Sequence, residues 1–259
     1  MSSGRIIRPE SSKPAAGLGR IGKIKIGQKV PGQTGERPVS LDYFRATGDY
    51  AQKFKEVYGD KPTNIKIVFM SDEPTLSCLE EWDGRDSQGR RAGYGDGRTT
   101  HLWNGKEYVI VDKDKAEAYS KEKGIKWNIV LTLNFIIPAI SGVLGLWTFS
   151  TKGDKSSIPQ IRNTFDTILE RLGTVVNVPF DLCVRKVKSQ NPGSTLLFPV
   201  VTLVPNISQE SIEVVKNYLS AGNNILQLGM LTDEKVNTIK ALPPKPDELT
   251  DYEEVKEEK

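Results

Sequence analysis

The chain has 259 residues and a formal net charge of +3 from 36 Lys+Arg and 33 Asp+Glu, a length that suits one large domain or two small ones. Its apolar fraction of 37% is low for a globular chain, so part of the chain is expected to be unpacked. The richest apolar stretch runs only from Phe135 to Trp147, whereas a membrane helix needs about 20 residues, and the N-terminus lacks the apolar core of a signal peptide. Two cysteines and one histidine exclude a disulfide scaffold and a four-cysteine zinc site. We therefore expect a soluble, cytoplasmic protein with no membrane partner.

The N-terminal region combines a basic arm with a basic strand. Residues 1–29 hold seven lysines and arginines and one acid, and residues 1–18 have the composition of a disordered segment. Between residues 19 and 27, Ile24 and Ile26 alternate with Lys23 and Lys25, which predicts a strand with one solvated, basic face.

A loop, a short helix and an unusual glycine-rich segment are expected next. Residues 31–38 read as a loop, and a helix is expected from an N-cap at Asp49 to Tyr58. After a buried strand over 65–70, residues 83–98 hold five glycines and four arginines, which predicts a long, mobile hairpin tip or flap without core residues.

The elements that follow the flap have clearer signals. Asn104-Gly105 predicts a type I′ hairpin turn, and residues 113–123 a polar helix. Strands are expected over 127–137, 142–150, 178–187 and 195–204. The clearest helix spans 157–172, with a capping box at Ser157 and Gln160 and one apolar stripe. Two short helices over 208–219 and 232–242 precede an acidic tail.

The sum is an α+β fold, mostly antiparallel sheet with a few packing helices. We expect a body over 19–242 between the disordered arm of 1–18 and the acidic tail of 243–259. A polar break near 112–126 leaves two alternatives open. The body can consist of halves over 19–112 and 126–242, or both halves can share one sheet.

Basic and aromatic side chains are the best candidates for contact with nucleic acid or a protein partner. Arginines can follow a phosphate backbone, and an exposed aromatic ring can stack on a base. The candidate residues are Lys23, Lys25, Arg85, Arg90, Arg91, Tyr94 and Arg98. The alternative is a solubilising loop, because Asp83, Asp86 and Asp96 offset most of the flap's charge. The four tryptophans, 82, 103, 127 and 147, are expected to be core or half-buried rather than a base-stacking surface.

Catalytic chemistry has little support. The phosphate-binding pattern GxxxxGK[ST] is missing, and the glycines of 93–97 lack the following helix that would bind an anion. Cys78, Cys183 and His101 have no second ligand at metal-binding spacing. The sequence thus predicts no cofactor, no metal and no catalytic residue.

The order of several segments resembles the phage recombination directionality factor-like family, whose founding member redirects a large serine integrase from integration to excision. The matching segments are Leu18–Gly27, Pro38–Thr47, Tyr50–Gly59, Pro62–Pro74, Tyr94–Gly97, Leu131–Pro138, Gly145–Thr151, Ser157–Ile158 and Val178–Leu182. Many members carry a cysteine cluster before the segment that matches 131–138, but residues 109–126 here contain none, so a zinc module is not expected.

The resemblance implies a non-enzymatic accessory factor in the cytoplasm of a bacterial host. Its partner would be a site-specific recombinase, with direct DNA contact left open. The basic arm, the arginines of 83–98 and the acidic tail of 247–259, with seven acids and two lysines, favour a second hypothesis. In that case the chain is a phage single-stranded-DNA-binding protein of replication or recombination.

Overall fold

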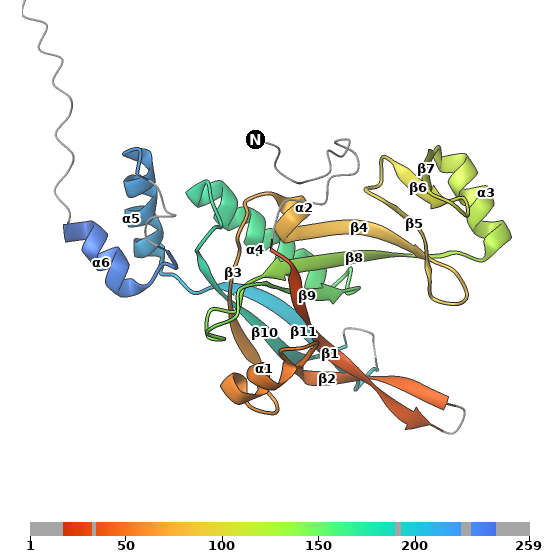
Figure 1. Cartoon of the computed structure of the whole chain (residues 1–259), viewed down its shortest axis with the longest axis horizontal. Helices are drawn as coiled ribbons and strands as arrows, with labels where there is room; N and C mark the ends of the chain where they lie inside the picture. The colour runs from red at the N-terminus through yellow and green to blue at the C-terminus, as the bar shows by residue number, and fades with distance from the viewer. Residues whose placement is uncertain (1–17, 33–34, 190–192, 224–228, 242–259) are drawn as a thin grey trace, which may run out of the picture.

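The computed structural model describes residues 18–32, 35–189, 193–223 and 229–241, arranged around two β-sheets (Figure 1). The expected basic arm, apart from Leu18, and the acidic tail lie outside the described residues. In spatial order, the larger sheet consists of β2 (Gly35–Thr47), β1 (Arg20–Gly32), β9 (Leu146–Thr151), β8 (Lys126–Phe135), β4 (Cys78–Arg85), β5 (Arg91–Gly95), β6 (Thr100–Trp103) and β7 (Tyr108–Val111). The smaller sheet consists of β11 (Leu197–Pro205), β10 (Pro179–Lys188) and β3 (Asn64–Val68).

The expected fold class is confirmed: the structure is α+β, and its named strands pair antiparallel except for the parallel pair β1 and β9. The helices are α1 (Ala51–Tyr58), α2 (Pro74–Ser77), α3 (Lys113–Lys123), α4 (Ser157–Leu172), α5 (Gln209–Ser220) and α6 (Asp233–Ala241). Strand β8 pairs with both β4 and β9, so strands from residues 19–112 and from 126–242 lie in one sheet.

The main core lies between the larger sheet, the smaller sheet and α4. The apolar stripe of α4 is buried as expected, and Phe165 on that helix meets Phe69 edge-on at 5.1 Å. Phe69 also contacts Phe180 of β10 at 5.3 Å, which joins the helix to the smaller sheet. The expected capping box of α4 is wrong. The hydroxyl of Ser157 accepts a hydrogen bond from the N–H of Val201 at 2.9 Å, so it joins the helix to β11.

Helix α1 forms where its pattern predicts and ends at Gly59, whose φ is +78°. Its N-cap, however, is Tyr50 rather than Asp49, and no side chain caps the helix. Burial of Phe54 against Trp147, at a ring distance of 6.0 Å, holds the helix in place without that cap.

The expected loop over 31–38 is largely strand. Strands β1 and β2 continue pairing to Gly32 and Gly35, with Lys29 opposite Pro38. An ion pair at 3.2 Å between Lys29 and Glu36 crosses this hairpin. The pair projects from the body as a two-stranded arm (Figure 1). Prolines and glycines are tolerated there because the two strands are exposed.

The segment over 83–98 contains a hairpin, as expected, but it is not a flap without core residues, because it forms the ends of β4 and β5 and two tight turns. Gly84 and Gly93 pair across these strands, and both lie under the ring of Trp127. A Cβ at either glycine would come within 3.0 Å of that ring. Here the two glycines make room for a tryptophan that packs on the sheet. A glycine-rich sequence therefore does not mean that this segment lacks packed side chains.

Strands β5, β6 and β7 and helix α3 form a lobe at the end of β4 and β8 (Figure 1). Helix α3 matches its expected bounds, with Asp112 as N-cap and Gly124 in a left-handed conformation at its end. Its small core contains Leu102, Ala116 and Ile125.

The hairpin between β6 and β7 has a four-residue turn, so the predicted type I′ turn is wrong. The N–H of Asn104 donates to the carbonyl of Glu107 at 3.1 Å, and the Asn104 side chain accepts from the N–H of Lys106 and of Glu107. A type I′ turn needs positive φ at both central residues, whereas only Gly105 has it.

The remaining expected elements are confirmed, although the strand expected over 142–150 begins only at Leu146. Strands β10 and β11 form the predicted hairpin, and α5 begins at Ser208, whose hydroxyl accepts from the N–H of Ser211 at 3.0 Å. Helix α6 follows Thr232, whose hydroxyl accepts from the N–H of Lys235 at 3.4 Å.

Candidate nucleic-acid and partner interface

The larger sheet has a core face and an open face. On β8, Leu131 and Leu133 are fully buried, whereas Thr132 and Asn134 point to the opposite side because side chains alternate along a strand. Thr148 of β9 lies opposite Asn134, and Lys23 of β1 lies opposite Thr148. We call the side that carries these polar residues the open face.

Helices α1, α3 and α4 pack against the core face. Phe54 of α1 meets Trp147, Phe165 of α4 lies in the main core, and Ala116 of α3 contacts Leu102. The four-residue helix α2 lies on the open face, where the amide of Asn134 donates to the carbonyl of Leu76 at 2.8 Å.

Basic side chains outnumber acidic ones on this face. Away from the hairpin arm, the paired registers of the described strands place seven cations there: Arg20, Lys23, Lys25, Arg45, Arg85, Arg91 and Lys126. The carboxylates among them are Glu81 and Asp83 of β4, opposite Val130 and Asn128.

Two of the arginines neutralise both carboxylates. The Nε of Arg85 lies 2.7 Å from Asp83, and Arg91 lies 2.6 Å from Glu81 and 3.4 Å from Asp83. Asp83 is only 3% exposed, so these arginines satisfy a buried charge. Within the described residues, the other five cations of the open face make no ion pair, and they are available to an anionic partner.

Five of the seven predicted contact residues, Lys23, Lys25, Arg85, Arg91 and Tyr94, lie on this one face. The other two lie in turns at its edge: Arg90 pairs with Asp86 at 2.9 Å, and Arg98 is exposed with no ion pair in the described part of the chain.

The two turns are ordered by carboxylates that accept backbone hydrogen bonds. Asp86 accepts from the N–H groups of Arg90 and Gln88, and the first of these bonds is the main cause that lowers its pKa. Asp96 accepts from the N–H groups of Thr99 and Arg98, which lower its pKa in the same way. Two of the three aspartates expected to offset the charge of this segment, Asp86 and Asp96, therefore also shape the turns.

An aromatic cluster occupies the open face of the lobe. It consists of Tyr94, His101, Trp103 and Tyr108, and Tyr94 lies parallel to His101 with ring centres 4.5 Å apart. Tyr108 meets Tyr94 edge-on and Trp103 at a tilt, each at 5.1 Å. The guanidinium of Arg91 lies 4.7 Å from the centre of the Tyr94 ring, so a cation joins the cluster.

Sequence reasoning identified only Tyr94 and Arg91 of this group. His101 lies directly opposite Tyr94, and Trp103 lies directly opposite Tyr108. The sequence signal was that His101 and Trp103, and likewise Tyr108 and Ile110, are two residues apart and so lie on one face of a strand. This spacing becomes informative only once the pairing of the strands is known. Of the four tryptophans, Trp147 is buried and Trp127 half-buried as expected, but Trp103 is 39% and Trp82 40% exposed.

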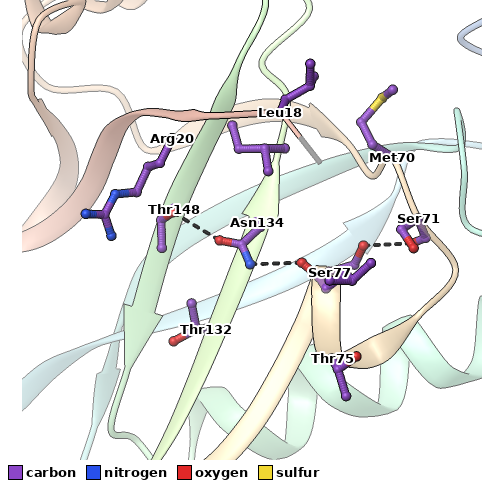
Figure 2. Close-up of a pocket in the computed structure, with 11 residues that line it drawn as sticks. Leu18, Arg20, Met70, Ser71, Thr75, Ser77, Thr132, Asn134 and Thr148 are labelled. Atoms are coloured by element: carbon purple, nitrogen blue, oxygen red, sulfur yellow. Dashed lines mark hydrogen bonds between the residues drawn. The ribbon is translucent and has the colours of Figure 1, made fainter. Parts of the chain in front are cut away.

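A cavity of about 530 Å³ lies on the open face where β1, β9 and β8 meet α2. Figure 2 shows Arg20, Thr148, Asn134 and Thr132 along one side of it, with Ser77 of α2 opposite. The hydroxyl of Thr148 donates to Asn134 at 3.0 Å, so the polar groups form a connected network. The lining can donate hydrogen bonds to an anion through Arg20 and the hydroxyl groups.

The described residues contain no group of three or more His, Cys, Asp or Glu side chains that could hold a metal ion. Burial raises the pKa of Cys78 to about 12, and burial also raises the pKa of Cys183. Both thiols therefore stay protonated at neutral pH. None of the described helices is long and apolar enough to cross a membrane.

Comparison with protein families finds a match over residues 21–206 to the Gp3-like family, described as recombination directionality factor-like. No curated protein and no solved structure matches the chain. The matched region runs from β1 to the end of β11 and includes both sheets, the aromatic cluster and nearly all of the open face. Because the match covers most of the chain, this protein belongs to the Gp3-like, recombination directionality factor-like family.

Proposed function

We propose that this protein is a non-enzymatic accessory factor that binds a large serine integrase and redirects it from integration to excision. The observation that carries the proposal is the family match across residues 21–206, which spans both sheets.

Such a factor acts by differential binding. It redirects the reaction only if it binds the integrase–DNA assembly that leads to excision more tightly than the assembly that leads to integration. A complete reversal of a strongly biased equilibrium needs a preference of about 10⁴-fold, or roughly 5.5 kcal/mol. A preference of that size is typical of an extensive protein–protein contact.

An apolar patch at the start of β11 supports a protein partner. Leu196, Leu197 and Phe198 are consecutive, and their side chains are 73%, 59% and 38% exposed. Leu197 and Phe198 lie on β11, an edge strand of the smaller sheet beside β10, and Leu196 directly precedes it. Contiguous exposed apolar side chains of this kind mark contact surfaces. In our proposal the integrase docks at this patch.

The direct test is recombination in vitro with the serine integrase of the same genome. We expect the protein to promote recombination between attL and attR sites and to inhibit recombination between attP and attB sites. Unchanged direction at saturating protein, with active integrase, would contradict the proposal.

The docking patch has a matched control. Leu196→Ser together with Leu197→Ser should abolish co-elution with the integrase and the change of direction, because it removes apolar contact area. Leu144→Ser changes a leucine of nearly equal exposure, 72%, on the segment before β9, and should leave both readouts unchanged. Equal losses in the two variants would remove the patch from the proposal.

A further inference from the structure

We propose that the open face is a binding site for single-stranded DNA, in which unpaired bases stack on the aromatic cluster and the backbone phosphates lie along the unpaired cations. The site is independent of the proposed integrase patch, since it lies on the larger sheet.

The aromatic cluster provides the base-binding part. Its four rings come from three neighbouring strands and hold one another at 4.5 to 5.1 Å, so they need little ordering when a ligand binds. The buried Nδ1 of His101 has no hydrogen-bond partner among the described residues, so stacking on Tyr94 sets the orientation of this ring. Trp103, 39% exposed, offers a π-surface to a ligand.

The cations provide the phosphate-binding part. Lys23, Lys25 and Arg45 form a group on β1 and β2, and Arg20 lines the cavity beside them. None of these four side chains makes an ion pair within the described residues, so they can bind phosphates without first breaking an internal contact. Arg91 also places a guanidinium beside the rings.

The arrangement favours a single strand over a duplex. Stacking on a side chain requires an exposed base face, and a duplex buries those faces between base pairs. Five strand spacings separate β1 from β6 in the larger sheet, which is about 24 Å at about 4.8 Å each. Sheet-based sites for single strands take about 4–16 nucleotides, and a strand of that length can reach both groups. Thr132, Asn134 and Thr148 provide hydrogen-bonding groups between them.

The stacking contact is tested by fluorescence anisotropy with the full-length protein and a fluorescein-labelled oligothymidine of about 20 nucleotides at low salt. Trp103→Ala should weaken binding roughly ten-fold, and Trp103→Phe should retain most of it, because a phenyl ring still stacks. Trp82→Ala is the matched control: Trp82 is 40% exposed but points to the other side of the sheet, so its removal should leave the affinity unchanged.

The phosphate contacts are tested by salt titration. In the Lys23→Ala, Lys25→Ala double variant, the slope of log K against log salt concentration should fall by about 1.4, since each lost single-strand phosphate contact contributes about 0.7. Lys66→Ala with Lys216→Ala removes the same charge from β3 and α5 and should keep the wild-type slope.

Three results would overturn the proposal. They are wild-type protein that binds no oligothymidine at low salt, a Trp103→Ala variant that binds like wild type, and a duplex of the same length that binds equally well with no effect of Trp103→Ala. Loss of integrase binding in open-face variants, without oligonucleotide binding by wild type, would make the face a protein contact instead. The assay contains no integrase, so its failure leaves the proposed recombination function untouched.

Discussion

At the residue scale, Arg91 connects the two kinds of chemistry on the open face. Its guanidinium pairs with Glu81 and Asp83 on one strand and lies over Tyr94 on its own strand. The arginine therefore neutralises a buried carboxylate and orients the aromatic cluster at the same time.

Arg91→Met tests this double role. The variant keeps a long side chain but leaves Asp83 with Arg85 as its remaining partner, and we expect a loss of about 1–3 kcal/mol in the free energy of unfolding. Chemical denaturation measures it. Arg90→Met is the control, because Arg90 is 72% exposed in a surface ion pair and should have no measurable effect. Equal stability of the Arg91 variant and wild type would show that the buried carboxylate does not need the second arginine.

Cys78 should be unreactive in the folded protein. Burial raises its pKa to about 12 from an unfolded value of 9.0, so the folded state keeps the thiol protonated. The resulting stability is present below about pH 9 and is lost as the pH rises toward 12, because the unfolded state loses its proton first. In a Cys183→Ser variant, a disulfide reagent at pH 8 should modify no thiol before denaturation and one thiol after it. Rapid modification of the native variant would contradict the burial of Cys78.

At the element scale, the glycine-rich segment over 83–98 shows that one composition is compatible with both a mobile loop and a packed pair of strands. Five glycines in sixteen residues are typical of a mobile loop. In the folded chain, Gly84 and Gly93 leave space for the ring of Trp127, which is more than thirty residues away in sequence. Composition could not separate these cases, because the residue that needs the space belongs to another strand.

Gly93→Ala should therefore disrupt the lobe. A Cβ at this position would lie 2.8 Å from the carbonyl oxygen of His101 and from the rings of Trp127, so β5 and β6 must move apart. We expect faster amide hydrogen exchange in β5, β6 and α3 and weaker oligonucleotide binding. Gly19→Ala, where nothing lies within 4 Å of the added carbon, is the control. Unchanged exchange in the lobe would show that the strands adapt to the methyl group.

At the scale of the whole molecule, the charge of the chain is unevenly distributed. The described open face is basic, whereas residues 247–259 carry seven acids and two lysines. An acidic segment on the same chain competes with DNA for a basic surface at a high effective concentration.

Replacing the seven acids of residues 247–259 by their amides should therefore tighten oligothymidine binding while keeping the full chain length. The anisotropy assay at two salt concentrations measures it, and the gain should shrink at the higher concentration because salt screens the competition. Replacing two acids elsewhere, Glu213 of α5 and Glu234 of α6, by glutamine is a control for the position of the lost charge and should leave the affinity nearly unchanged. Equal affinity of the tail variant and wild type would exclude competition by the tail.

The sequence by itself determined the fold class, most helix and strand positions and the family, because these depend on local periodicity, caps and the order of segments. It also marked Lys23, Lys25, Arg91 and Tyr94 as candidate contact residues from their chemistry alone. Only the tertiary structure decided that these side chains share one face, that His101, Trp103 and Tyr108 complete the aromatic cluster, and that Arg85 and Arg91 are partly occupied by Asp83 and Glu81. The physical reason is that the register of a strand, and the face of the sheet on which each side chain lies, depend on pairing with strands far away in the chain.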